Sequence, residues 1–203
     1  MKKTLKVFMI CLLALMLLAA DIAAFAATGS NVLTLPASLK SIKDEAFYGD
    51  TSIGKVIVPG TVTEICSRVF AKSTLSEIVL PERLSSVGEG AFMECKQLTK
   101  IVLPERIKTI NSNTFVRCSK LESVMLPQSL TRIESTAFMG CSALKEINLM
   151  GNIEYIANTA FALCPNVVAT VEEGSYAETW CKNAGITTKI FGDEEDGGGW
   201  ASF

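Results

Sequence analysis

The chain has 203 residues, and its 19 basic and 21 acidic residues give a formal net charge of −2 at pH 7. Nucleic-acid-binding surfaces and basic membrane patches need clustered Lys and Arg, which this sequence lacks, so we expect neither partner. The absence of histidine excludes His-dependent catalytic triads and imidazole zinc sites. No pattern of paired carboxylates is present either, so we expect no enzymatic activity, no cofactor and no metal site.

Residues 1–26 are predicted to be a secretory signal peptide. Three lysines precede an apolar run over residues 7–20, and small residues follow up to Ala26. The apolar run of roughly 14 residues is shorter than the ~20 that a membrane-spanning helix needs. We therefore expect cleavage after Ala26, no stable membrane span after cleavage, and a mature protein that is secreted or held at the cell surface. An uncleaved N-terminal anchor and lipidation of Cys11 are the alternatives.

A sixfold repeat with a phenylalanine in each unit follows the signal peptide. The phenylalanines are separated by 22 or 23 residues, and a fixed period in the twenties predicts a solenoid. Each unit approximates the motif L-x-x-I-x-L-P-x-x-L-x-x-I-x-x-x-A-F-x-x-C. The marker residues are Phe47, Phe70, Phe92, Phe115, Phe138 and Phe161.

One unit, residues 75–97, shows what each part of the motif predicts. Ile78 and Leu80 alternate with period two, which predicts a short strand with both side chains pointing inward. Pro81 follows and ends the strand, because proline has no N–H to donate to a neighbouring strand. The apolar residues from 84 to 92 predict turns or a single helical turn against the strand layer. Equivalent residues of all units should form apolar columns in the core.

The motif resembles the BspA-type leucine-rich repeats of bacterial secreted and surface proteins, over about residues 31–172. This resemblance implies a leucine-rich repeat solenoid: a right-handed superhelix of about six 23-residue coils, with a parallel β-sheet on one face and turns or short helical segments on the other. It also implies a role in binding proteins or in adhesion to host or neighbouring cells. We assign residues 27–172 to this solenoid.

The array departs from the motif at one internal turn and at its C-terminal end. Residues 71–74 are one residue shorter than in other units, which predicts a tighter turn after Phe70. Residues 173–190 predict a helical C-terminal cap that ends at Gly185, with Tyr176 and Trp180 four residues apart on one face. The acidic, glycine-rich residues 191–203 predict a solvated tail, and they lack the spaced ligands of a calcium loop.

Four cysteines share one position of the repeat, so their side chains should form a ladder about 4.8 Å apart. A linear ladder does not offer zinc a tetrahedron, and parallel side chains do not converge as a disulfide requires. Buried free thiols are our interpretation, also for Cys66 and Cys181, with disulfides and metal binding as alternatives. The four are Cys95, Cys118, Cys141 and Cys164.

The middle residue of each predicted strand should face the open side of the sheet. Our hypothesis is that four consecutive apolar residues there, the apolar row, contribute to a protein-binding strip. The alternative is that β-propensity alone fills a half-exposed strand. A neighbouring row of alternating charge, which includes Lys55, Glu77 and Lys100, should form cross-strand pairs. The apolar row consists of Ile57, Val79, Val102 and Met125, and it lies between Thr34 and Asn148.

These patterns predict an exported, non-enzymatic recognition module whose ligand is a protein of unknown identity. A structural spacer in a surface assembly and a noncatalytic accessory of a secreted hydrolase are the alternatives.

Overall fold

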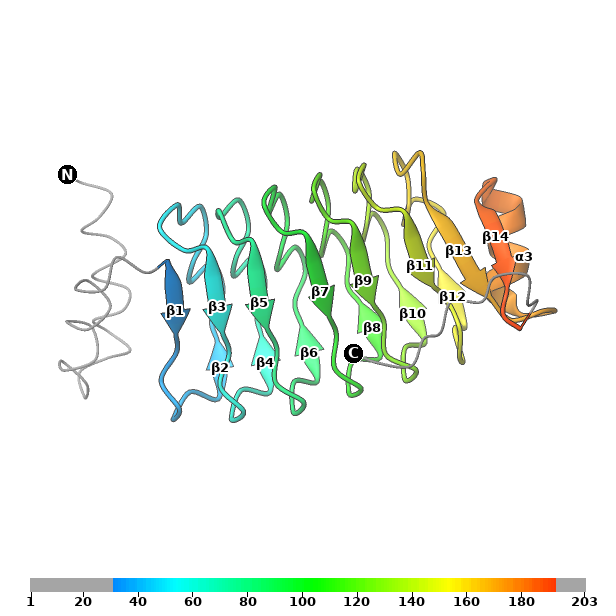
Figure 1. Ribbon diagram of the computed structural model, residues 1–203. Helices are drawn as coiled ribbons and strands as arrows, with labels where there is room; N and C mark the ends of the chain where they lie inside the picture. The colour runs from blue at the N-terminus through cyan, green and yellow to red at the C-terminus, as the bar shows by residue number, and fades with distance from the viewer. Residues whose placement is uncertain (1–30, 193–203) are drawn as a thin grey trace.

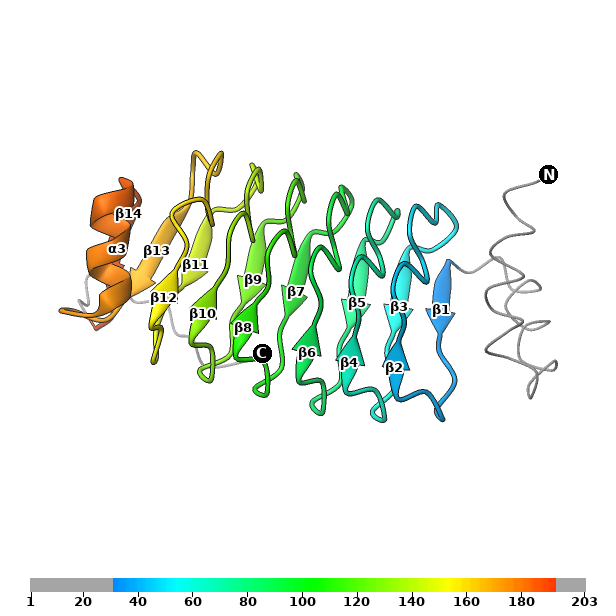
Figure 2. The ribbon, with the colours of Figure 1, turned by 180° about the vertical axis from the view of Figure 1, so that it is seen from behind.

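The computed structural model describes residues 31–192, which form a single elongated stack of coils (Figures 1 and 2). The predicted signal peptide and residues 193–203 of the predicted tail lie outside the described residues. No helix within residues 31–192 is long and apolar enough to cross a membrane. The first column of parallel strands consists of β1 (Val32–Thr34), β3 (Lys55–Ile57), β5 (Glu77–Val79), β7 (Lys100–Val102), β9 (Ser123–Met125), β11 (Glu146–Asn148) and β13 (Val168–Val171).

The opposite side of each coil consists of turns, as predicted, but it also holds a second column of two-residue strands. Each strand ends in an Ile or Val, β-branched residues that favour extended backbone. In four of these coils the residue after the strand donates its N–H to the preceding coil, as Cys66 does to the Ile42 carbonyl at 2.9 Å. This column consists of β2 (Ser41–Ile42), β4 (Glu64–Ile65), β6 (Ser86–Val87), β8 (Thr109–Ile110), β10 (Arg132–Ile133) and β12 (Tyr155–Ile156).

The turn around each phenylalanine forms a third line of main-chain hydrogen bonds between coils. In the first such turn, Phe47 donates its N–H to the Val69 carbonyl at 2.9 Å. The residues two before and two after most of the phenylalanines have positive φ, for example Arg68 at 56° and Lys72 at 61°. Non-glycine residues rarely adopt this conformation, so the hydrogen bonds between coils must stabilise it.

The phenylalanine rings form a continuous stack through the core. Neighbouring rings lie 5.0 to 5.7 Å apart between centroids and are nearly parallel. Trp180 packs against the last ring, Phe161, in a tilted arrangement, with 5.9 Å between ring centroids and 58° between ring planes. The stack therefore ends against the C-terminal cap. Besides the six coils that carry a phenylalanine, β13 starts a further coil without one, so the solenoid has about seven coils.

The helical C-terminal cap is present as α3 (Tyr176–Ala184), and its predicted end at Gly185 is confirmed. Ser175 accepts the Glu178 N–H at 3.1 Å, and Gly185 ends the helix at φ 70°. The Tyr176 hydroxyl accepts the Ile156 N–H at 3.3 Å and so satisfies the edge of β12. One further strand, β14 (Thr187–Ile190), was not predicted, and it pairs in parallel with β13.

Both strand columns are interrupted between the same two coils. The first column divides into the sheets β1-β3-β5 and β7-β9-β11-β13-β14, and the second divides into β2-β4-β6 and β8-β10-β12. We call the boundary between the β5–β6 coil and the β7–β8 coil the open junction. The phenylalanine turns still connect these coils through three main-chain hydrogen bonds. In each bond an N–H of the first coil donates to a carbonyl of the next: Gly90 to Ser112 at 3.0 Å, Phe92 to Thr114 at 3.0 Å and Glu94 to Val116 at 2.8 Å.

The turn after Phe70, which ends at Leu75, is shorter, as the missing residue predicts. Residues 73–76 run directly into β5, whereas the next coil contains an additional turn at residues 96–97. The two loops of unequal length leave a hollow of about 230 Å³ beside Thr74 and Glu94. The shortened coil thus lies immediately before the open junction.

Candidate functional site

The apolar row lies on the outer face of the first strand column. The exposed fraction is 38% for Ile57, 46% for Val79, 56% for Val102 and 54% for Met125. The residue before each of them points inward and is buried, because successive side chains of a strand alternate between faces. The structure thus places all four residues on the surface, as the strand period predicts.

The open junction divides the apolar row into two pairs. Ile57 is in register with Val79, and Val102 is in register with Met125. Val79 and Val102 belong to β5 and β7, which are not paired. A ligand on this face would therefore contact two sheets that are connected by the phenylalanine turns.

The neighbouring row of alternating charge, which includes Lys55, Glu77 and Lys100 and is called the charged row below, forms the expected pair at one position. Lys55 Nζ lies 2.6 Å from Glu77 Oε1 across β3 and β5. Among the described residues, no ion pair connects Glu77 to Lys100, so the prediction of continued cross-strand pairing is wrong there. The physical reason is that β5 and β7 are unpaired, which removes the register that brings opposite residues together.

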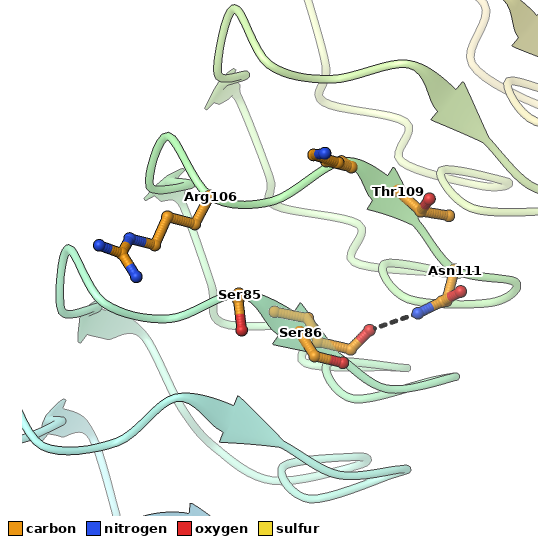
Figure 3. A pocket seen from close by; sticks show the side chains of 7 residues that line it. Ser85, Ser86, Arg106, Thr109 and Asn111 are labelled. Atoms are coloured by element: carbon orange, nitrogen blue, oxygen red, sulfur yellow. Dashed lines mark hydrogen bonds between the residues drawn. The ribbon is translucent and has the colours of Figure 1, made fainter.

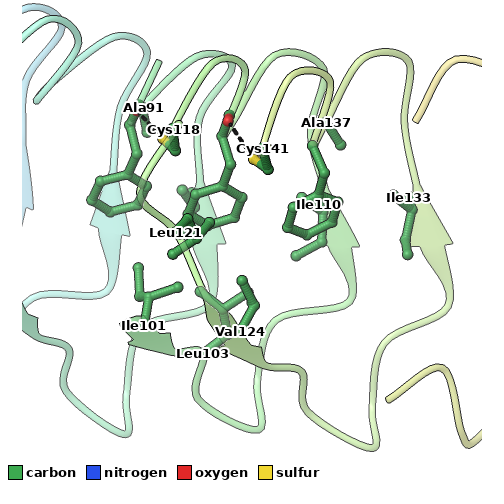
Figure 4. Packing of buried hydrophobic residues seen from close by; sticks show 14 of the residues in the cluster. Ala91, Ile101, Leu103, Ile110, Cys118, Leu121, Val124, Ile133, Ala137 and Cys141 are labelled. Atoms are coloured by element: carbon green, nitrogen blue, oxygen red, sulfur yellow. Dashed lines mark hydrogen bonds between the residues drawn. The ribbon is translucent and has the colours of Figure 1, made fainter. Parts of the chain in front are cut away.

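The cysteine ladder consists of free thiols, and it satisfies carbonyl groups in the core. Cys118 Sγ donates to the Phe92 carbonyl at 3.1 Å, and Cys141 Sγ donates to the Phe115 carbonyl at the same distance (Figure 4). Burial raises the pKa of the Cys95 thiol to about 12, so it remains protonated at neutral pH. Protonated, buried thiols are poor nucleophiles and poor metal ligands. Residues 31–192 contain no cluster of metal-ligating side chains.

A polar cleft of about 450 Å³ opens in the second strand column, at the open junction (Figure 3). Figure 3 shows Arg106 at one end of the cleft and Asn111 at the other, with Ser85 and Ser86 between them. Asn111 Nδ2 donates to the Val87 carbonyl at 2.7 Å, across the junction. The complete lining is Ser85, Ser86, Val87, Arg106, Lys108, Thr109 and Asn111.

The repeat pattern alone does not predict this cleft, although two signals in the sequence point to it. Only the two coils beside the junction carry Pro-Glu-Arg in the turn after the first strand, at residues 81–83 and 104–106. Asn111 is also the only amide in its column of the repeat. The other residues of that column are Lys43, Cys66, Gly88, Glu134 and Ala157.

The sequence matches the profile of the BspA type leucine-rich repeat region in six copies, over residues 21–127 and 63–178. The chain belongs to the BspA-type leucine-rich repeat family. This membership confirms the family resemblance and the solenoid fold that the repeat motif predicts. A comparison with curated proteins found no match.

Solved structures of bacterial leucine-rich repeat proteins share the fold. The T. pallidum leucine-rich repeat protein TpLRR is 26% identical, with a TM-score of 0.63, and the match covers 79% of this chain and 86% of that protein. A leucine-rich repeat protein from Eubacterium ventriosum is also 26% identical, with a TM-score of 0.54, over 66% of this chain and 43% of that protein. The pneumococcal vaccine antigen PcpA is 16% identical, with a TM-score of 0.50, and the match covers 79% of this chain and 41% of that protein. At this identity the likeness shows only a shared fold.

Proposed function

We propose that this protein is an exported, non-enzymatic module that binds a protein ligand at the cell surface or outside the cell, as an adhesion or recognition protein does. The observation that carries the proposal is the apolar row, in which Val102 and Met125 are more than half exposed on a regular sheet face. Membership of a repeat family whose solenoids expose such continuous faces supports it. The chain's lack of histidine and the raised thiol pKa values in its core support a non-catalytic role.

The apolar row would form the centre of a larger contact. A stable interface buries roughly 800 Å² per partner, whereas four half-exposed side chains offer only a patch on the order of a few hundred Å². Binding energy usually concentrates in such an apolar centre, and a polar rim excludes water from it. The charged row, with the exposed residues Lys100 and Glu146, borders the apolar row in the position of a rim.

Replacement of the central pair by lysine tests the proposal. The exported protein with Val79→Lys and Val102→Lys should bind a panel of immobilised bacterial cells and extracellular-matrix proteins at least ~30-fold more weakly, because a charge would be buried without a partner. Thr34→Lys with Asn148→Lys adds the same charge at the two polar ends of the same strand positions, and it should retain binding. Unchanged binding by the double valine variant, with an unchanged circular dichroism spectrum, would contradict the proposal.

Export has a separate test. N-terminal sequencing of the protein recovered from the medium or the cell surface should begin at Ala27. Recovery of only the uncleaved chain, from the cytoplasm, would contradict export.

A further inference from the structure

We propose that the cleft at the open junction binds an extended acidic peptide segment of a partner protein. Arg106 and Lys108 would hold the carboxylates of the segment, and free main-chain groups beside β6 and β8 would hydrogen-bond its backbone. This inference rests on the proposed protein-binding function and adds the chemical class of a partner segment. The cleft belongs to the second strand column, so it is a contact separate from the apolar row.

Main-chain groups are free at this junction because the hydrogen bonds of the other junctions are missing. At the neighbouring junctions, the main-chain N–H of Ser85 donates to the Thr63 carbonyl at 2.9 Å, and the main-chain N–H of Thr131 donates to the Lys108 carbonyl at 2.9 Å. Among the described residues, the Ser85 carbonyl receives no equivalent bond from the next coil. Unpaired groups of this kind at the edge of a strand are a template for another extended chain.

Two residues explain why the junction is open. A Cβ on Gly88 would lie 2.5 Å from the Cys66 carbonyl carbon, so glycine allows this coil to approach the preceding one unusually closely. On the other side, the Asn111 side-chain amide donates a hydrogen bond to the Val87 carbonyl at 2.7 Å. At the other junctions of this column, a main-chain N–H donates to the equivalent carbonyl. The longer reach of the side chain holds the Asn111 backbone away from β6. The opening therefore follows from the sequence of two adjacent coils.

The charges of the cleft favour an acidic ligand. Its lining contains Arg106 and Lys108 and no carboxylate. No ion pair among residues 31–192 involves either of them, whereas Arg132 in the next coil is 3.0 Å from Glu134. Glu82 and Glu105 lie in the adjacent turns but do not line the cleft. Two cations without partners in a chain of net negative charge form a local binding site for carboxylates.

A peptide fits the cleft better than a simple anion does. A fully deprotonated anion such as sulfate can only accept hydrogen bonds, so it cannot satisfy the free Ser85 carbonyl. A peptide backbone supplies both N–H and C=O groups, and the cleft presents an acceptor at Ser85 as well as a donor at the Asn111 N–H. Its volume of about 450 Å³ is within the ~300–1,000 Å³ range of binding sites for small ligands, which leaves room for a short segment.

Calorimetric titration of the exported protein with a capped peptide, acetyl-(Glu-Val)₃-amide, tests the proposal. We expect a dissociation constant below about 1 mM at low salt, and at least tenfold weaker binding of acetyl-(Gln-Val)₃-amide. Arg106→Gln with Lys108→Gln should weaken binding of the acidic peptide about tenfold, because two charge-assisted contacts are lost. The matched control, Lys40→Gln with Lys43→Gln, removes two cations from the first coil and should have no effect.

Further arms separate the peptide from simpler ligands. Sulfate or glutarate that binds as tightly as the peptide would overturn the assignment to a peptide, as would equal binding of the glutamine peptide. Asn111→Ala should let the two coils pair, protect the amide of residue 111 from hydrogen exchange and weaken peptide binding. Retained affinity despite that protection would overturn the main-chain contacts.

The same titration separates this inference from the proposed function. The double variant Val79→Lys with Val102→Lys should bind the acidic peptide normally. Normal peptide binding, together with unaltered cell or matrix binding by that variant, would refute the apolar row and leave the cleft supported. Absence of peptide binding to the folded wild-type protein would refute the cleft alone.

Discussion

Phe115→Ala in the middle of the ring stack should be among the most destabilising substitutions in this protein. Phe115 is completely buried, and its ring lies 5.4 Å from Phe92 and 5.3 Å from Phe138. Truncation removes the apolar area, leaves a cavity and ends both ring contacts. The cost of such a change is about 3–5 kcal/mol. This loss is a large part of the ~5–15 kcal/mol by which a domain is usually stable.

Phe47→Ala is the matched control at the end of the stack. Phe47 is 9% exposed and has a single stacked neighbour, Phe70, at 5.4 Å. Phe47→Ala should lower the free energy of unfolding by roughly 1 kcal/mol less than Phe115→Ala does, because Phe47 has one stacked neighbour and Phe115 has two. Urea unfolding followed by circular dichroism measures both losses. Equal losses, or a smaller loss for Phe115→Ala, would refute the idea that the stacked column carries the stability of the coils.

Three further predictions concern the thiols, the cap and the open junction. Burial raises the pKa of the Cys95 thiol to about 12, while an unfolded thiol ionises near pH ~8.5; the unfolded state therefore loses its proton first as the pH rises, and stability falls. Between about pH 8.5 and 10 this effect should lower the free energy of unfolding by about 1.5 kcal/mol, as measured by urea unfolding. Cys95→Ser introduces the residue that Ser73 supplies at the same repeat position, and it should remove that part of the loss. An identical pH dependence in the variant would contradict the account. Ser175→Ala removes the side chain that accepts the Glu178 N–H, and it should cost about 1 kcal/mol in thermal unfolding; a loss that is undetectable would show that the cap hydrogen bond is not needed. Gly88→Ala should cost about 1–3 kcal/mol of stability, because the added Cβ would clash with the Cys66 backbone. The control, Gly60→Ala, adds a Cβ that would contact nothing within 4 Å, so it should change stability by less than about 0.5 kcal/mol. The reverse order would contradict the close approach at Gly88.

The sequence predicts the core of this fold because each column of the repeat has a single physical role. The position of Phe115 holds phenylalanine in six coils and the position of Cys118 holds cysteine in four, and a side chain that repeats with the coil period must meet its equivalents above and below. The outward direction of Val102 follows in the same way from the period of a strand. The end of helix α3 is predictable because Gly185 is a strong stop signal.

The remaining features depend on contacts between particular coils. Arg68 and Lys72 adopt positive φ although neither residue favours it, because hydrogen bonds to the next coil determine their conformation. The interruption of the second strand column falls between the coils of Gly88 and Asn111, and no repeat average contains that combination. Strand β14 has no repeat motif, and its pairing with β13 follows from where α3 ends.

Site-specific photocrosslinking in the producing cell tests the central claim, protein binding through the sheet face, most directly. A photoreactive amino acid at Val102 should form a discrete higher-mass adduct with another protein, while the same group at Thr34, at the polar end of the same strand position, should not. Adducts at Thr34 but not at Val102, or none at either position in exported protein, would contradict it.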